Sequence, residues 1–223
     1  MAKEEKVITS EQKQVLNFFS KEDYLTKRFY LTGGTPLSAF YLFHRISEDL
    51  DFFSEKEVYL PAVRNFVQKL QKKINLVKVD YRRFLGLHSF YLFLTEERFL
   101  KIDFNYYPFR RIEKGMIYKN IEVDSLYDIA VNKVHTISME ARARDFIDIY
   151  FILKEKGYDF KKLILDAKAK FDWHIDPVQL GTQLVKASDL SDYPRMLVKI
   201  DHDEWKEFFI KEALKLKKEI FKK

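Results

Sequence analysis

The chain has 223 residues, of which 47% are hydrophobic and 33% are charged, and it carries a formal net charge of +6. This composition excludes a disordered polymer and predicts one sizeable domain, or a folded core with a helical extension. The chain has no cysteine, which excludes disulfide frameworks, zinc–thiolate sites and cysteine nucleophiles.

The absence of cysteine suits a reducing compartment, and we expect a cytoplasmic protein. The first ten residues, MAKEEKVITS, lack the apolar stretch of a signal peptide. No segment approaches the roughly 18 consecutive apolar residues that a membrane-spanning helix needs, so we expect no membrane association. The positive charge mildly favours an anionic partner such as a nucleotide or nucleic acid, although a generic basic surface has the same charge.

The first half of the chain mixes helical and alternating apolar patterns, which predicts an α+β fold with a small mixed sheet. Ser10 can cap the first helix, and Pro36 suits the first turn of another. Thr95-Glu96-Glu97 is typical of a hairpin connection between two strands. The expected elements, in chain order, are a helix at 10–19, a strand at 29–31, a helix at 36–43, a strand at 49–53, a helix at 61–73, and strands at 76–84, 90–94 and 98–106.

Helical periodicity dominates after about residue 122, so we expect an α/β core over residues 1–122 and a helical domain over residues 123–223. The expected helices cover 124–139, 142–154, 160–171, 177–186 and 203–221. The tail from Trp205 to Lys223 has seven lysines and three glutamates. It could contact RNA phosphates, but a docked amphipathic helix with a solvated lysine face is the more common arrangement.

Two motifs in the first half suggest a phosphate and metal site. Gly33-Gly34-Thr35 lies between a predicted strand and helix, where glycines permit close backbone approach and a helix N-terminus suits a phosphate. Asp49 and Asp51 are two residues apart on a predicted strand and therefore point to one face. Two carboxylates at this spacing can hold Mg²⁺, whereas without a cation they would repel each other. A simple turn and a solvated strand end are the structural alternatives.

Asp103 is a candidate third carboxylate. Alternation places Leu100, Ile102 and Phe104 on one face of its strand, and Lys101 and Asp103, followed by Asn105, on the other. If this strand lies beside the strand of Asp49 and Asp51, Asp103 joins them. An ordinary polar sheet face is the equally open alternative.

Charged residues also interrupt the apolar stripes of two predicted helices. Lys133 falls near the middle of a stripe formed by Leu126, Ile129, Ala130 and Ile137, where a buried ammonium needs a partner such as a phosphate. A lysine that snorkels to the surface is the alternative.

Asp148 is the only charge in the eight-residue apolar run 146–153. Arg144 precedes it by one helical turn and can pair with it, which is the structural alternative. A role for Asp148 in positioning Lys133 or in binding nucleotide is the functional alternative.

Together these segments resemble the AbiEii/AbiGii abortive-infection toxin family of the polymerase-beta-like nucleotidyltransferase superfamily. Asp128 with Lys133 is similar to the family's D-x4-K motif, and residues 142–148 are similar to its R-x-K-D-x-x-D motif, with Arg144 where the family often has lysine. Arginine and lysine are not equivalent at a ligand site. The matches span residues 33–148, about half of the chain, and begin with Gly33-Gly34-Thr35 and the segment HRISEDLDFF at 44–53.

The resemblance implies a minimal nucleotidyltransferase α/β core, a following helical domain and an active-site cleft between them. It implies transfer of a nucleoside monophosphate from an NTP to an acceptor, such as a tRNA 3′ end, by a toxin with a cognate antitoxin. The catalytic residues would be Asp49, Asp51, Asp103, Lys133 and Asp148. One or two Mg²⁺ ions would bind to Asp49, Asp51 and Asp103. The nucleotide-binding residues would be Gly33, Gly34, Thr35, Arg45, Ser47, Asp128, Arg144 and Asp145.

Two other functions fit the same residues. The acceptor could be a small molecule or a protein hydroxyl, in which case an enclosed acidic pocket would replace an open basic cleft. The chain could also be a non-catalytic nucleotide-binding relative, although its intact Asp49, Asp51 and Lys133 argue against that function.

Overall fold

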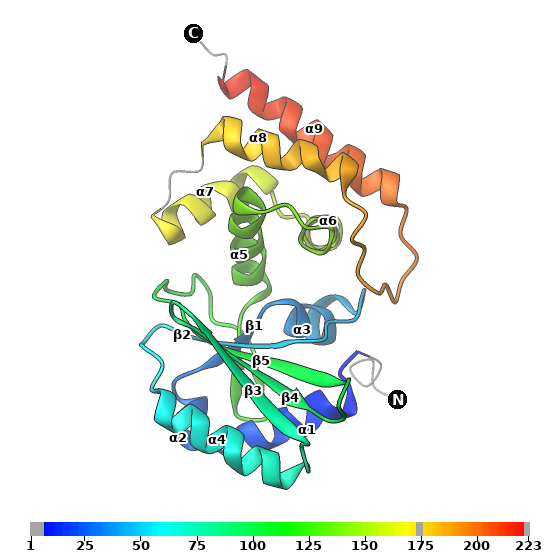
Figure 1. Cartoon of the computed structure of the whole chain (residues 1–223). Helices are drawn as coiled ribbons and strands as arrows, with labels where there is room; N and C mark the ends of the chain where they lie inside the picture. Colours follow the sequence, from blue (N-terminus) through cyan, green and yellow to red (C-terminus); the bar gives the residue numbers. More distant parts are fainter. Residues whose placement is uncertain (1–6, 173–175, 221–223) are drawn as a thin grey trace. The chain divides into compact units, whose positions relative to one another are not determined.

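The computed structural model describes residues 7–172 and 176–220, with side chains described up to Leu216. The chain divides into two compact units, Met1–Leu126 and Tyr127–Lys223. The first combines a sheet with helices and the second is helical, which confirms the predicted α+β class (Figure 1). Among the described residues, no helix is both long and apolar enough to pass through a membrane.

The first unit is built on a seven-stranded mixed sheet with the strand order β3-β4-β5-β2-β1-β7-β6. The pairs β2–β5 and β1–β7 are parallel, and the other neighbours are antiparallel. The two short strands β6 and β7 were not predicted, because two or three residues are too few to show an alternating pattern. The strands are β1 (Tyr30–Thr32), β2 (Leu50–Ser54), β3 (Lys78–Phe84), β4 (Leu87–Phe93), β5 (Phe99–Tyr106), β6 (Ile117–Tyr118) and β7 (Ile121–Val123).

One face of this sheet is covered by the helices α1 (Ser10–Phe19), α2 (Asp23–Thr26) and α4 (Leu60–Lys73), as Figure 1 shows. Stacked phenylalanines join the helices to the strands: the ring centroids are 4.1 Å apart for Phe19 and Phe52 and 5.3 Å apart for Phe52 and Phe104. All three side chains are fully buried. Because strand residues alternate between faces, this aromatic core fixes which side chains reach the opposite face.

The first helix begins one residue earlier than its predicted cap implied. Thr9, and not Ser10, is the cap residue: the Gln12 N–H donates to Thr9 Oγ1 (3.1 Å), and the Thr9 N–H donates to Gln12 Oε1 (3.0 Å). This reciprocal pair satisfies two N–H groups at the helix start, which Ser10 does not do.

The segment predicted as a single helix at 36–43 starts earlier than predicted and is mostly π-helical. It begins at α3 (Gly34–Pro36), continues as the π-helix η2 (Leu37–Leu42), and ends at Phe43, whose φ is 55°. A π-helical segment is rare and occurs frequently at functional sites. Apolar periodicity cannot distinguish it from an ordinary α-helix over so few residues.

The second unit contains five α-helices and one short 3-10 helix within its described residues. Its core includes Phe146, whose ring centroid is 4.7 Å from that of Phe209 and 6.2 Å from that of Trp205. The last predicted helix was expected to reach residue 221, which lies outside the described residues. The helices are α5 (Leu126–Met139), α6 (Ala143–Lys156), α7 (Phe160–Phe171), α8 (Pro177–Val185), η3 (Lys186–Asp189) and α9 (His202–Ile220).

Phe104→Ala is expected to lower the free energy of unfolding by about 3–5 kcal/mol, because it leaves a cavity within the stacked aromatic core. Phe99→Ala, on the same strand but at a side chain that is 47% exposed, should lower it by less than about 1 kcal/mol. Urea denaturation followed by circular dichroism measures both. Equal losses for the two variants would contradict the assignment of the core face.

Candidate active site

The carboxylates of the first unit meet on the sheet face opposite the aromatic core. β2 and β5 are parallel neighbours, and their register places Asp51 directly beside Asp103. The condition under which Asp103 joins Asp51, that their two strands are neighbours, is therefore met. Asp49 lies just before β2 rather than on it, since the strand begins at Leu50.

Lys101 lies among these carboxylates and was not predicted as a site residue. Its Nζ is 2.6 Å from Asp103 Oδ2 and 4.0 Å from Asp49 Oδ2. Burial alone would lower the pKa of the ammonium group, but the hydrogen bond and charge of Asp103, with the charges of Asp49 and Asp51, raise it. Lys101 thus serves as an internal counter-cation. Its place on the Asp103 face was readable from strand alternation, but its contact with Asp49 depends on the pairing of two distant strands.

The chemistry of these carboxylates fits a divalent cation. Carboxylate oxygens are the ligands that Mg²⁺ prefers, and Asp103 Oδ1 is buried without a hydrogen-bond partner among the described residues. Among the described residues, however, no three acidic or histidine side chains lie close enough together to hold a metal ion in their present positions. The single positive charge of Lys101 offsets only part of the negative charge of the three carboxylates. The metal set of Asp49, Asp51 and Asp103 stays a prediction.

The glycine turn packs against the acidic site so closely that side chains are excluded. A Cβ on Gly33 would lie 2.4 Å from Asp51 Oδ2, and Gly33 also has a positive φ of 82°. A Cβ on Gly34 would lie 2.6 Å from Ser47 Oγ and 2.7 Å from Arg45 Nη2. Contacts below 3.0 Å force a displacement, so a side chain at Gly34 would push the Ser47 or Arg45 side chain aside, and at Gly33 the positive φ also favours glycine. The turn brings together five of the residues that were predicted for this site.

The loop that leads to Asp49 is held by partly buried hydrogen bonds. Thr35 Oγ1 donates to the backbone carbonyl of Asp49 (2.5 Å), and Gln12 Nε2 donates to that of Ser47 (2.9 Å). Arg45 is 4% exposed, and its Nη1 donates to the carbonyl of Ile46 (2.9 Å). The Thr35 hydroxyl therefore positions Asp49 in this structure. Gln12 was missed by the sequence analysis, because nothing in a helix near the N-terminus indicates a contact 35 residues away.

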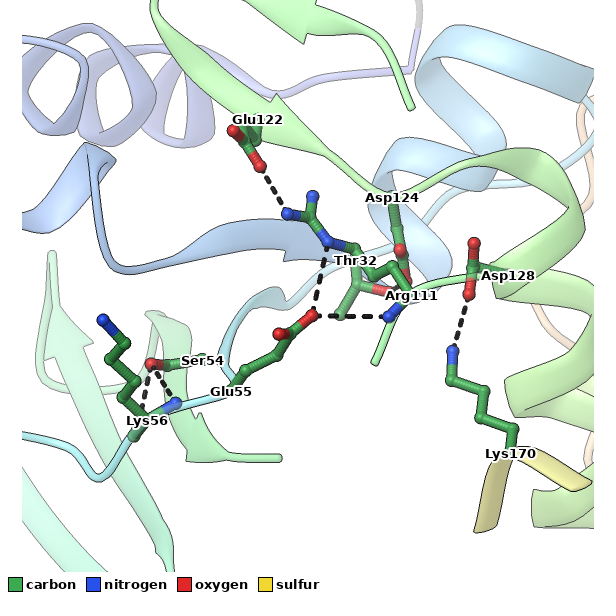
Figure 2. Close-up of polar contacts among 9 residues, drawn as sticks. All are labelled: Thr32, Ser54, Glu55, Lys56, Arg111, Glu122, Asp124, Asp128 and Lys170. Atoms are coloured by element: carbon green, nitrogen blue, oxygen red, sulfur yellow. Dashed lines mark hydrogen bonds and ion pairs between the residues drawn. The ribbon is translucent and has the colours of Figure 1, made fainter. Parts of the chain in front are cut away.

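A further network fixes the end of β1, next to the glycine turn. Thr32 Oγ1 donates to Asp124 Oδ2 (2.7 Å), and the Asp124 N–H donates to the carbonyl of Leu31 (2.9 Å). Figure 2 shows this pair together with Arg111, whose Nη2 lies 2.6 Å from Glu122 Oε2. These contacts anchor the strand that carries the turn.

In the second unit, Lys133 is held by two buried carboxylates. Its Nζ lies 2.7 Å from Asp145 Oδ1 and 2.6 Å from Asp148 Oδ2, and the three side chains are 9%, 4% and 0% exposed. Of the two alternatives for Asp148, the structure has the contact with Lys133 on helix α5 and not the pairing with Arg144, which is exposed on helix α6. Helical spacing alone could not show that a tertiary partner is available.

Burial disfavours the charged form of Asp145, but the charges of Lys133 and Arg142 outweigh it and lower its pKa. Arg142 Nη2 lies 2.8 Å from Asp145 Oδ2.

Asp128 has its own buried partner. Its Oδ1 lies 2.7 Å from the Nζ of Lys170, and the side chains of the aspartate and the lysine are 0% and 1% exposed (Figure 2). Lys170, on helix α7, was not predicted, because its role depends on the packing of α7 against α5.

Comparisons with known proteins agree with this architecture. A family model described as "Nucleotidyl transferase AbiEii toxin, Type IV TA system" matches residues 19–218. The uncharacterized protein aq_aa25 of Aquifex aeolicus (strain VF5) is 29% identical over 143 residues, which span 64% of this chain and 66%, just under two thirds, of that protein.

Two solved structures share the fold. A protein of H. pylori, described provisionally as a nucleotidyltransferase, has a TM-score of 0.59 and 18% identity, with 94% of each chain covered. MenT4, the nucleotidyltransferase toxin Rv2826c of Mycobacterium tuberculosis H37Rv, has a TM-score of 0.53 and 15% identity, with 94% of this chain and 86% of MenT4 covered. At these identities the similarity concerns the fold alone.

Lys101→Met is expected to destabilise the metal-free protein by about 2 kcal/mol, because Asp103 loses its charge partner. Millimolar Mg²⁺ or Mn²⁺ should then raise the melting temperature of the variant more than that of the wild type. Lys78→Met is the control, since Lys78 pairs with Asp80 (3.2 Å) where both side chains are about half exposed. If Lys101→Met melts like the wild type in a chelator, Lys101 does not compensate the carboxylates.

The depressed pKa of Asp145 predicts an acid-sensitive second unit. The stabilisation from the charged carboxylate is present above the ordinary aspartate pKa of 3.8 and is lost as the pH falls through the lower folded pKa. Between pH 5 and pH 3, the free energy of unfolding should therefore fall more for the wild type than for Asp145→Asn. Tryptophan fluorescence measures the unfolding of the second unit, because both tryptophans of the chain lie after residue 127. If the free energy of unfolding falls equally with pH in the wild type and in Asp145→Asn, the charged Asp145 does not stabilise the second unit.

Proposed function

Because the chain belongs to the nucleotidyltransferase AbiEii toxin family of type IV toxin–antitoxin systems, we propose that it transfers a nucleoside monophosphate from an NTP to an acceptor hydroxyl. The acceptor oxygen bonds to the α-phosphorus, the bond from that phosphorus to the bridging oxygen breaks, and pyrophosphate leaves. The observation that carries the proposal is the register of Asp51 beside Asp103, with Asp49 adjacent and the Gly33–Gly34 turn packed against them.

The residues of the first unit divide into two roles. Asp49, Asp51 and Asp103 would hold Mg²⁺, which supplies charge neutralisation at the triphosphate when bound. The N–H groups at the start of α3, from Gly34 onward, lack carbonyl partners within the helix and suit phosphate oxygens. Asp103 Oδ1 accepts no hydrogen bond from the described residues. Asp103 would therefore serve either as the third metal ligand or as the base that takes the proton of the acceptor hydroxyl.

The second unit supplies the cationic contact to the triphosphate in this proposal. Lys133 is the residue assigned to it by the family motif, and Asp145 and Asp148 fix the position of its ammonium group. Asp128 and Arg144, the other motif residues, would support the nucleotide side of the site. Lys170 holds Asp128 in place.

The acceptor is proposed to be RNA, with the 3′ end of tRNA as the first candidate. The net charge of +6 supports an anionic acceptor over a cationic small molecule. Type IV toxins are paired with antitoxins, so we propose a cognate antitoxin protein as a partner and the cytoplasm as the location. A short reading frame directly beside the gene would support that pairing.

The direct test is incubation of the protein with labelled NTPs, Mg²⁺ and total tRNA. Asp49→Ala should reduce label transfer by about 100-fold or more, because it removes a predicted metal ligand. Glu48→Ala is the matched control: the neighbouring acid is exposed and should leave transfer unchanged. If the wild type and Asp49→Ala both fail to label any acceptor with any of the four NTPs, the enzymatic function is wrong.

A further inference from the structure

The outer strands β3, β4 and β5 present a second face that is distinct from their core face. Their core-facing residues include Phe90, Leu92 and Ile102, all buried. The opposite face carries aromatic and basic side chains that are exposed or half-buried. Strand register places them in rows: Lys78 beside Phe93 and Phe99, Asp80 beside Tyr91 and Lys101, and Arg82 beside Ser89 and Asp103.

The aromatic residues of this face form a continuous group. The ring centroid of Phe99 is 5.3 Å from that of Tyr91 and 5.4 Å from that of Phe93. Phe99 is 47% exposed, and Tyr91 and Phe93 are half-buried. The rings are inclined to one another, by 69° for Tyr91 and Phe99 and by 48° for Phe93 and Phe99. Single exposed aromatics are common on protein surfaces, but neighbouring rings on an open sheet face give unpaired bases several aromatic surfaces to pack against.

Cations lie directly over two of these rings. The Cζ atom of Arg82 is 4.9 Å from the ring centroid of Tyr91, and Lys78 Nζ is 4.3 Å from that of Phe93. Asp80, which lies beside these rings, is paired with Lys78 at 3.2 Å, and Asp103 is the acidic residue of the next row. This combination of rings and cations matches the alternating bases and phosphates of a single strand.

This face is continuous with the proposed catalytic carboxylates. Phe99, Lys101 and Asp103 follow one another on the same face of β5. At about 3.4 Å per strand residue, Phe99 lies about 14 Å from Asp103, which is room for about four bases at the roughly 3.4 Å spacing of a stacked strand. An unpaired end that lies along β5 would therefore bring its terminal hydroxyl to Asp103.

We propose that the open face of β3, β4 and β5 binds the unpaired 3′ end of an RNA acceptor. Tyr91, Phe93 and Phe99 stack on its bases, and Arg82 and Lys78 contact its phosphates. This inference rests on the proposed nucleotidyl transfer, and it specifies which surface selects the acceptor.

The test is fluorescence anisotropy of a short labelled single-stranded RNA with the full chain, without NTP. Tyr91→Ala, Phe99→Ala and Arg82→Ser should each weaken binding by about tenfold, while Tyr91→Phe should bind like the wild type. Arg83→Ser is the matched control, because Arg83 is the next residue of β3, is also exposed, and points to the other face. Melting temperatures check that the variants are folded.

The salt dependence separates the two kinds of contact. Arg82→Ser should reduce the slope of log Kd against log salt by about 0.7, the value for one phosphate contact to a single strand, and Tyr91→Ala should leave it unchanged. Equal weakening by Arg82→Ser and Arg83→Ser would mean diffuse electrostatic binding and would overturn the proposal. Unchanged binding by Tyr91→Ala and Phe99→Ala, or equal affinity for duplex RNA, would overturn it as well.

The same experiments distinguish this surface from the catalytic function. If the wild type labels a protein or small molecule but does not bind single-stranded RNA, the surface is wrong and nucleotidyl transfer stands. If it binds RNA through Tyr91 and Arg82 but transfers no label, the surface stands and the catalytic function is wrong.

Discussion

The parallel pairing of β2 with β5 is the constraint on which the first unit depends. It places Asp51 beside Asp103 on one face while Phe52 and Phe104 stack on the other. A slip of one residue would move the carboxylates into the aromatic core and the rings to the surface. The packing that stabilises the unit therefore also assembles its acidic site, and Lys101 offsets the resulting repulsion.

The glycine turn and the loop before β2 shape this acidic site by close packing and by hydrogen bonds to backbone carbonyls. The missing Cβ atoms of Gly33 and Gly34 leave room for the side chains of Asp51, Ser47 and Arg45, which pack directly against the turn. Thr35 and Gln12 hold the approaching loop through backbone carbonyls. In the second unit, by contrast, charge pairing dominates: the buried Lys133 has two carboxylate partners. A buried ion is tolerated only with such partners.

Much of the fold was predictable from local patterns. Long periodic segments such as α4 and α7 and the alternating strand β5 were predicted to within one or two residues, because each carries a full apolar face. The short strands β6 and β7, the π-helix η2 and the exact cap of α1 were not. Their conformations depend on a few hydrogen bonds and on neighbouring elements, which leave little trace in residue order.

The sequence by itself determined the residue types and their faces: the glycine turn, the spacing of Asp49 and Asp51, and the outward direction of Asp103. These follow from fixed strand and helix periods, which act within a few residues. Tertiary structure alone decided the partners. It joined Asp148 to Lys133 instead of Arg144 and placed Lys101 between two carboxylates. The partner of each buried charge depends on which distant segments pack together. The energy of a buried charge is set by the atoms within a few ångströms of it and not by distance along the sequence.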